Sequence, residues 1–293
     1  MNVQPTLTLR HDNAVYSVAF SSDGKLLASG SLDKTIRIWE RPSGNEKFRL
    51  KGHREAICTV VFQHGDSSLL SASLDKTLRT WNLESGELKS TMSGHQAYLT
   101  CMAAPADGAL AVSGSHDMEL ILWDVTATAQ LVTLKGHTDL VSCVALSPDG
   151  RFVASGGHDL LIRIWDVASK QQVRETGPHP KPIQSVAFSP DGATVAASDE
   201  SPAIRLWKFA DGKIERTFEK HERSVKTVAF SPDGRHLASG GADSVILVHE
   251  VTSGQIKHTL NGHQNAIYGL AWSPDGQHLA SASFDRTVRV WKL

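Results

Sequence analysis

The stretch HTDLVSCVALSPDGRFVASGGHDLLIRIWD, residues 137–166, contains the pattern that decides the fold. Two short apolar runs, 141–146 and 152–157, flank an SPDG segment whose proline and Asp-Gly pair suit a tight turn. A third run, 161–166, is rich in β-branched residues and includes a tryptophan. With a fourth run at 172–176, these segments predict four short antiparallel strands in one small sheet.

This unit recurs every 42 residues along the chain. The histidine that opens it occurs at His11, His53, His95, His137, His179, His221 and His263. The tryptophan occurs at Trp39, Trp81, Trp123, Trp165, Trp207 and Trp291, with His249 in the remaining position. Related turns start at residues 21, 63, 105, 147, 189, 231 and 273. A fixed period of this length indicates one supersecondary unit copied seven times.

The repeat predicts an all-β fold with almost no helix. A four-stranded sheet cannot bury both of its faces alone, but seven such sheets stacked radially can. We therefore expect residues 1–293 to form a single domain, a seven-bladed β-propeller of four-stranded antiparallel blades. The last repeat stops on its third strand, and the first has a spare strand within residues 3–9. Pairing of that strand with 287–292 would close the ring and remove open sheet edges.

The closing turn differs from the other connections between repeats. Leu134 precedes His137 by three residues, whereas Leu9 precedes His11 by only two. A shift of one residue moves a strand's side chains to the opposite face of a sheet. We therefore expect the closing turn to be shorter than its counterparts.

Composition excludes several classes of function. A net charge of -1 and a pI of about 6.9 leave no basic footprint for nucleic acid. The first ten residues lack a signal pattern, and no apolar run approaches the roughly 20 residues that span a bilayer. We expect a soluble, cytoplasmic monomer with no membrane partner. Cys58, Cys101 and Cys143 lie in apolar strand segments and are interpreted as small buried residues in a reducing compartment.

With GH, SPDG, LASGS-x-D and IRIW in this order, the chain resembles the WD-repeat β-propeller family over its full length. The resemblance implies that histidine, a strand-two serine, a loop aspartate and a strand-three tryptophan form a structural hydrogen-bonded tetrad. The implied tetrads are His11, Ser29, Asp33, Trp39; His53, Ser71, Asp75, Trp81; His95, Ser113, Asp117, Trp123; His137, Ser155, Asp159, Trp165; and His263, Ser281, Asp285, Trp291.

Two repeats depart from this pattern. In the fifth, Ala197 and Ser201 replace the serine and the aspartate, so that only His179 and Trp207 remain. The sixth keeps the other three residues but has His249 in place of tryptophan. We expect these two adjacent blades to be held least tightly.

More narrowly, the chain resembles the propeller portion of bacterial WD-repeat serine/threonine protein kinases. It contains no glycine-rich phosphate loop and no HRD or DFG motif, so these residues hold no kinase domain. The resemblance implies a non-catalytic scaffold that binds proteins or peptides, such as the regulatory module of a signalling kinase. An enzyme with an unrecognised site in the channel is the alternative.

Two kinds of chemistry deserve weighing against the structural interpretation. Linked serine, histidine and aspartate resemble a hydrolase triad, but these serines lie in apolar strands and an indole N–H needs their oxygen. His116 and His158 occupy the same loop position in neighbouring blades. Zinc needs three or four ligands, and two loops on separate blades rarely supply them. We therefore predict no catalytic residue, no metal and no cofactor.

Partner binding is expected at loop positions where the copies differ, because loops on a rigid scaffold carry function. Aromatic and large apolar residues in loops are costly to expose and often anchor a partner. The hypothesis for a protein or peptide docking patch is Tyr16, Leu32, Leu74, Tyr268 and Phe284. The alternative is that these side chains pack on one another. A second candidate patch for an acidic or phosphorylated segment is Lys181, Arg223 and Lys226, with an ordinary solvated face as its alternative.

Overall fold

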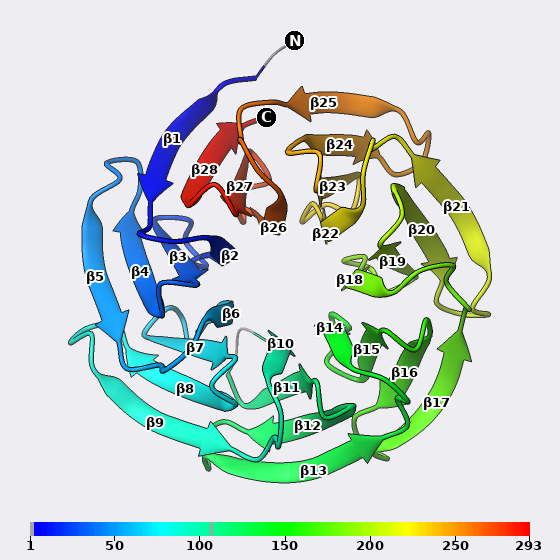
Figure 1. The fold of residues 1–293 in the computed structure, drawn as a ribbon, viewed down its shortest axis with the longest axis horizontal. Helices are drawn as coiled ribbons and strands as arrows, with labels where there is room; N and C mark the ends of the chain where they lie inside the picture. Colours follow the sequence, from blue (N-terminus) through cyan, green and yellow to red (C-terminus); the bar gives the residue numbers. More distant parts are fainter. Residues whose placement is uncertain (1–2, 106–107) are drawn as a thin grey trace.

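The computed structural model describes residues 3–105 and 108–293, and this part of the chain forms seven four-stranded antiparallel sheets around a central channel (Figure 1). The innermost strands are β2 (Val15–Phe20), β6 (Ile57–Gln63), β10 (Leu99–Ala103), β14 (Val141–Leu146), β18 (Ile183–Phe188), β22 (Val225–Phe230) and β26 (Ile267–Trp272). The second strands are β3 (Leu26–Ser31), β7 (Ser68–Ser73), β11 (Leu110–Ser115), β15 (Phe152–Gly157), β19 (Thr194–Asp199), β23 (His236–Gly241) and β27 (His278–Ser283).

The two outer positions of each sheet complete the blades. The third strands are β4 (Thr35–Glu40), β8 (Thr77–Asn82), β12 (Glu119–Asp124), β16 (Ile162–Asp166), β20 (Ala203–Lys208), β24 (Ile246–Glu250) and β28 (Thr287–Lys292). The outermost strands are β5 (Glu46–Lys51), β9 (Leu88–Ser93), β13 (Ala129–Lys135), β17 (Gln171–Thr176), β21 (Ile214–Glu219), β25 (Ile256–Leu260) and β1 (Pro5–Arg10). We number the blades 1 to 7 by their innermost strands, starting with β2.

The predicted all-β propeller is confirmed, and the described residues contain no helix. In the repeat that decides the fold, β14 and β15 have the predicted bounds, whereas β16 begins one residue later and β17 one residue earlier than expected. The turn predicted at 105–108 includes residues 106 and 107, which lie outside the described part of the chain. No helix that could cross a membrane is present among the described residues.

The ring is closed by the N-terminal strand, as predicted. Blade 7 has the order β1-β28-β27-β26, and β1 pairs antiparallel with β28 (Figure 1). The strand begins at Pro5 and ends at Arg10, so the predicted range 3–9 was wrong at its end by one residue. The pairing satisfies the outer edge of β28, which would otherwise be a free edge for another chain.

The shorter closing turn leaves the strand register unchanged. Leu9 lies opposite Val288 in blade 7, as Leu50 lies opposite Ile36 in blade 1. The missing residue therefore falls in the connection after the strand, where Gly52 in the next repeat adopts a φ of 148°. Without such a glycine, the closing turn is a tighter link, and the amide of His11 donates to the carbonyl oxygen of Arg286 at 2.9 Å.

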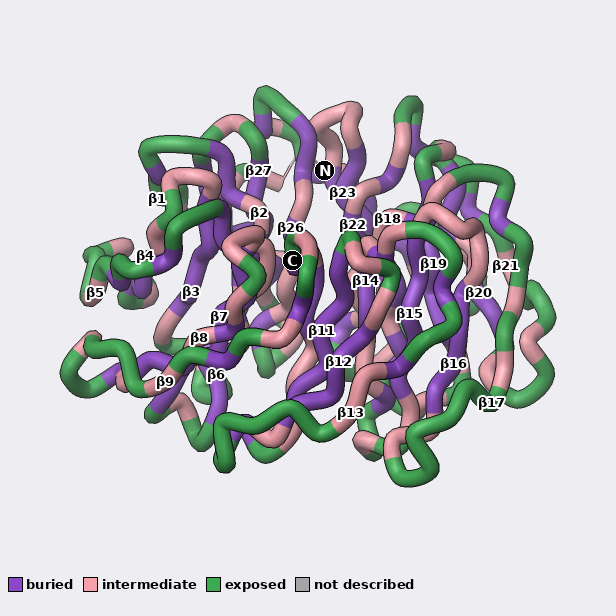
Figure 2. Tube along the Cα trace, turned by 60° about the horizontal axis from the view of Figure 1, so that its bottom comes forward, coloured by how far each residue is buried: buried purple, intermediate pink, exposed green. Residues whose placement is uncertain are grey.

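The hydrophobic core lies between neighbouring blades rather than within one blade. At the junction of blades 1 and 2, Ile36 and Ile38 from β4 pack with Ile57 and Val60 from β6. An apolar cluster of this kind occupies each of the seven junctions. Figure 2 shows the result, with buried strands at the junctions and exposed loops at the two ends of the ring. Function therefore has to be sought in loops and in the channel.

Candidate functional site

The loop that ends each second strand is tied down by a buried polar network. In blade 1, His11 Nδ1 lies 3.0 Å from Asp33 Oδ2, and its Nε2 lies 2.7 Å from Ser29 Oγ. The indole N–H of Trp39 donates to the same Ser29 oxygen at 2.8 Å. Four side chains from three segments of the blade are thereby joined in one chain of hydrogen bonds.

Charges in this network are arranged so that the histidine stays neutral. Burial lowers the pKa of His11, and the hydrogen bond to Asp33 opposes that change only in part. Burial would raise the pKa of Asp33, but hydrogen bonds from His11 and Thr35 outweigh it and hold that pKa well below its usual range. Nδ1–H then donates to the carboxylate, while Nε2 accepts from the Ser29 hydroxyl.

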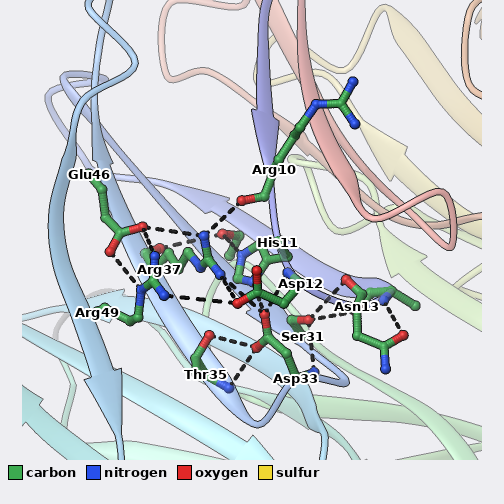
Figure 3. A network of polar contacts seen from close by, with 12 residues as sticks. Arg10, His11, Asp12, Asn13, Ser31, Asp33, Thr35, Arg37, Glu46 and Arg49 are labelled. Carbon is green, nitrogen blue, oxygen red and sulfur yellow. Dashed lines mark hydrogen bonds and ion pairs between the residues drawn. The ribbon is translucent and has the colours of Figure 1, made fainter.

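Figure 3 shows how the loop of blade 1 is fastened further. Arg37 donates through Nη1 to the carbonyl oxygen of Arg10 at 2.9 Å, and through Nη2 to Asp12 at 2.7 Å. Arg49 donates through Nε to Glu46 at 2.8 Å. The Arg37 side chain is nearly buried, with 6% exposed. Because it belongs to β4 and contacts Arg10 and Asp12, it holds the closing turn against that strand.

The same connections recur in four more blades. In blades 2, 3, 4 and 7 the shortest histidine–aspartate, histidine–serine and indole–serine distances all lie between 2.7 and 2.9 Å. The serines concerned are fully buried. Although aspartate, histidine and serine are ordered as in a hydrolase triad, each serine oxygen already accepts an indole N–H and cannot reach a substrate.

Blade 5 corrects one interpretation from the sequence. More than His179 and Trp207 remains of its tetrad, because His179 Nδ1 lies 3.0 Å from Asp199 Oδ2. Asp199 is the last residue of β19, two positions before Ser201, and it also accepts from Arg205 Nη1 at 2.6 Å. Within the described part of the chain, His179 Nε2 and Trp207 Nε1 have no hydrogen-bond partner. Blade 5 thus keeps the carboxylate and lacks only the serine oxygen.

Blade 6 keeps the loop network but loses its tryptophan anchor. His221 Nδ1 lies 2.9 Å from Asp243, and its Nε2 lies 2.8 Å from Ser239. His249 is fully buried and stacks on Phe218 with ring centroids 4.8 Å apart, yet neither ring nitrogen has a partner among the described residues. Burial, followed by the charge of His221, lowers the pKa of His249 to about 4. A neutral imidazole therefore fills the tryptophan position.

The channel forms a cavity of about 520 Å³ at its centre. Residues of the inner strands line it, and so do loop residues at the end where the tetrad aspartates lie. Of the predicted docking patch, Tyr16, Leu74 and Tyr268 line this cavity. Leu32 is half-buried outside the lining, and Phe284 is 42% exposed. The structure therefore brings three of the five predicted residues to the channel cavity, and the patch as a whole stays a prediction.

Tyr268 contacts the two other aromatic rings of that patch. Tyr16 and Tyr268 meet edge to face with centroids 5.2 Å apart, and Phe284 lies 6.2 Å from Tyr268. Burial, followed by the nearby Tyr268, raises the pKa of Tyr16. Mutual packing, the alternative considered from the sequence, is thus present for these rings. Packing leaves Phe284 exposed, so it does not remove a surface for a partner.

Sequence reasoning missed a second exposed group on the same face. Tyr98 is 52% exposed and its ring lies 5.8 Å from that of His116, while Met118 is 44% exposed. The position of Tyr98 carries alanine in three other repeats, Ala14, Ala56 and Ala266. A large aromatic residue at a position that is otherwise small was the available signal.

The second candidate patch is only partly assembled. Lys226 lines the channel cavity and donates to Gln184 Oε1 at 3.1 Å, and Gln184 in turn donates to Glu200 at 3.4 Å. Lys181 and Arg223 are exposed, and no ion pair or side-chain hydrogen bond involves either within residues 3–105 and 108–293. The basic sector therefore remains a hypothesis with one member in the channel and two on the rim.

The cysteines and histidines of the channel hold no assembled metal centre. Burial raises the pKa of Cys58, Cys101 and Cys143 well above the ordinary value of a thiol, which keeps all three protonated. His116 and His158 both line the channel cavity. Among the residues that the structure describes, no group of three or more histidine, cysteine or carboxylate side chains could hold a metal ion.

Comparison with known proteins agrees with the geometry. The family model described as WD domain, G-beta repeat, matches residues 3–40, 44–82, 86–124, 128–166, 170–208, 212–250 and 254–292. The chain belongs to the WD40 repeat family. Every match ends at the last residue of the strand that carries the tetrad tryptophan or its replacement, so the family repeat is offset from the blade by one strand. This offset is what allows β1 to complete blade 7.

Individual relatives share about one repeat with this WD40 chain. The chain is 62% identical over 34 residues to vegetative incompatibility protein HET-E-1 of Podospora anserina, and the match covers 12% of this chain and 2% of that protein. It is 51% identical over 47 residues to THO complex subunit 3 of Arabidopsis thaliana, covering 15% of each. It is 49% identical over 45 residues to the probable serine/threonine-protein kinase PkwA of Thermomonospora curvata, covering 15% of this chain and 6% of the kinase.

Proposed function

We propose that this WD40 ring is a non-catalytic interaction module that binds a protein segment at the channel mouth. The observation that carries the proposal is the contact of Tyr16, Tyr268 and Phe284 beside a cavity of about 520 Å³. Aromatic side chains provide large contact area at little conformational cost and are frequent energetic centres of interfaces. WD40 propellers typically serve as such scaffolds, and this chain fits that role.

A peptide library displayed on phage and selected against the purified ring tests the proposal. Peptides selected on the wild type should bind the Tyr268→Ala and Phe284→Ala variants at least tenfold more weakly, because each change removes an anchor. Tyr98→Ala is the control, since it removes an exposed tyrosine outside the patch. Equal affinity for wild type and both patch variants would refute binding at this mouth.

The basic sector is a second candidate, favoured by the position of Lys226 in the channel cavity. If the occupant is acidic or phosphorylated, Lys181→Glu, Arg223→Glu and Lys226→Glu should each weaken binding. Lys213→Glu, which changes an 81% exposed lysine on blade 5, is the control. A steep loss of affinity with salt would indicate nucleic acid instead. Turnover of a substrate by the purified ring would refute the non-catalytic assignment.

A role as the regulatory module of a signalling kinase in the bacterial cytoplasm is a finer hypothesis. Its support is the similarity of about one repeat to PkwA, together with the propeller organisation. The reading frame that encodes the chain tests it: a kinase domain in the same frame supports the hypothesis. If the frame lacks one, the ring has to act on separate partners.

A further inference from the structure

The junction between blades 6 and 7 differs from its counterparts at the end of the ring opposite the tetrad loops. The second strands of the blades begin with Leu26, Ser68, Leu110, Phe152, Thr194, His236 and His278. The matching positions on the outermost strands, assigned from the strand register, are Phe48, Ser90, Val132, Arg174, Arg216, His258 and Leu7. Blade 6 alone has histidine at both positions.

In blade 1 these two positions close the junction with apolar side chains. Leu26 and Phe48 pack against the buried cluster that includes Leu83 of the next blade. In blade 6, His236 and His258 stand there instead, and a cavity of about 470 Å³ is present. It is lined by Arg235, His236, Glu250, Thr252, Lys257 and His258, and we call it the blade-six pocket. In blade 6, polar and charged side chains therefore stand where apolar side chains close the junction in blade 1.

Strand register directs both imidazoles to the same face of blade 6. His236 lies opposite Glu250, and His258 lies opposite Val248, which belongs to the apolar cluster shared with blade 7. Across the junction, the ring of His236 stacks on Trp272, with centroids 6.4 Å apart. The Trp272 indole is fixed in turn by donating to the carbonyl oxygen of Ala229 at 3.0 Å. His236, which lines the pocket, is therefore held by its contact with blade 7.

Positive charge in the blade-six pocket is only partly compensated. Lys257 lies 3.2 Å from Glu250, the single carboxylate of the lining, and Glu250 also accepts from the Ser253 hydroxyl. Arg235 is 82% exposed at its side chain, and its ion pair with Asp233 is long, at 3.9 Å. The pKa of His258 is lowered by burial and then by the charge of His236. The described lining thus holds two permanent cations, Arg235 and Lys257, and the carboxylate of Glu250, while Asp233 pairs with Arg235 from outside the lining.

We propose that the blade-six pocket binds a phosphate group, supplied by a phosphorylated protein side chain or by a free anion. Guanidinium, ammonium and imidazole N–H groups are the donors that tetrahedral oxyanions prefer, and they enter here from two strands, β23 and β25, and the turn before β23. The cavity is larger than a bare phosphate needs, which leaves room for the group that carries it. This site lies on the opposite end of the ring from the channel mouth and does not depend on the function proposed above.

Calorimetric titration of the purified ring with sodium sulfate and with inorganic phosphate, at constant ionic strength set by chloride, tests the site. Sulfate keeps its charge near neutral pH, so a saturable signal is independent of ligand titration. We expect saturable binding of both anions and a shift of the His258 imidazole resonances in NMR spectra. The double variant H236L/H258F restores the side chains of blade 1 and should abolish binding.

Two milder variants keep the test valid if the double variant fails to fold. Arg235→Gln and Lys257→Gln change exposed side chains and should each weaken sulfate binding at least fivefold. Their matched control is Arg151→Gln, which removes the arginine at the same repeat position in blade 4, and H278L removes the histidine of blade 7. Both controls should bind sulfate like the wild type. Absence of saturable binding, or binding that Arg235→Gln and Lys257→Gln leave unchanged, would overturn the proposal.

A short phosphoserine peptide, compared with its unphosphorylated form, identifies the source of the phosphate. Binding of the phosphopeptide that Arg235→Gln weakens supports a phosphorylated protein partner. Binding of inorganic phosphate without binding of the peptide supports a free anion in the same pocket. Binding of both peptide forms with equal affinity would show recognition without the phosphate group and would overturn the proposal.

Discussion

Blades 1 and 5 share one backbone plan, but blade 5 lacks the serine oxygen that joins histidine to tryptophan in blade 1. In blade 1 the Ser29 hydroxyl joins His11 to Trp39. In blade 5, Ala197 occupies that position, and the facing atoms of His179 and Trp207 have no partner among the described residues. The histidine and tryptophan rings are nevertheless 5.5 Å apart in blade 5 and 6.0 Å apart in blade 1. Packing between blades therefore maintains the frame, and the tetrad adds to its stability.

Removing the serine oxygen from blade 1, as in blade 5, should change the free energy of unfolding most. Ser29→Ala leaves His11 Nε2 and Trp39 Nε1 buried without partners, at about 1–3 kcal/mol for each unsatisfied group. We expect the free energy of unfolding, measured by urea denaturation, to fall by about 4 kcal/mol. The control is Ser198→Ala, because the Ser198 hydroxyl is buried but has no partner in the described structure. A loss below about 0.5 kcal/mol for Ser29→Ala would show that the tetrad is not stabilising.

The comparison also shows where sequence reasoning succeeds. The period of 42 residues predicts the blades and the closure of the ring, and the resemblance to the WD-repeat family implies the five complete tetrads. Asp199 was missed because it stands where Ser31 stands in blade 1, at the end of the second strand. The repeat spacing places Ser201 where other blades have the aspartate, but the carboxylate of Asp199, two positions earlier, contacts the imidazole of His179. Only coordinates reveal that substitution.

Blade 6 tests what happens when the tryptophan itself is replaced. His249 has a pKa of about 4 in the folded protein, below the ordinary value of 6.5. The unfolded chain binds a proton at this residue as pH falls below about 6.5, while the folded chain resists it. The free energy of unfolding is therefore not reduced by His249 above about pH 6.5. It falls by roughly 3 kcal/mol through this residue as the pH decreases from 6.5 towards 4.

Denaturation curves at pH 7.5, 6.0 and 4.5 measure this decline. Other buried histidines titrate too, so the informative quantity is the difference in slope between the wild type and His249→Phe. Phenylalanine retains the stack on Phe218 without a titratable group. We expect a flatter dependence on pH for the variant. Parallel curves would contradict the assignment of a proton-sensitive site to blade 6.

The sequence predicts least about the loop surfaces. It indicates that Tyr16, Tyr268 and Phe284 belong to one sector of the ring, but it does not predict that Tyr16 and Tyr268 line the channel cavity while Phe284 stays exposed. Nor does it reveal the blade-six pocket, because His236 and His258 are 22 residues apart and are brought together only by strand register and the outer bulge. Recognition depends on side-chain positions across blades, which the repeat leaves free to vary.

Adding a serine oxygen to blade 5, as in blade 1, should change the free energy of unfolding least. The direction of this change is informative, because an increase is expected. In Ala197→Ser, the new hydroxyl can donate to His179 Nε2 and accept from Trp207 Nε1, which are both unpartnered in the described structure. A hydrogen bond contributes a net of about 0.5–1.5 kcal/mol, so we expect the free energy of unfolding to rise by about 1–2 kcal/mol. Ala196→Ser is the matched control, because Ala196 and Ala197 are equally buried in apolar clusters, and the unpartnered atoms of His179 and Trp207 belong to the serine position that Ala197 occupies. Its hydroxyl should destabilise the ring. If both serines lower stability alike, the atoms of His179 and Trp207 do not form a ready site for an oxygen, and the missing hydroxyl is not what distinguishes the stability of the two blades.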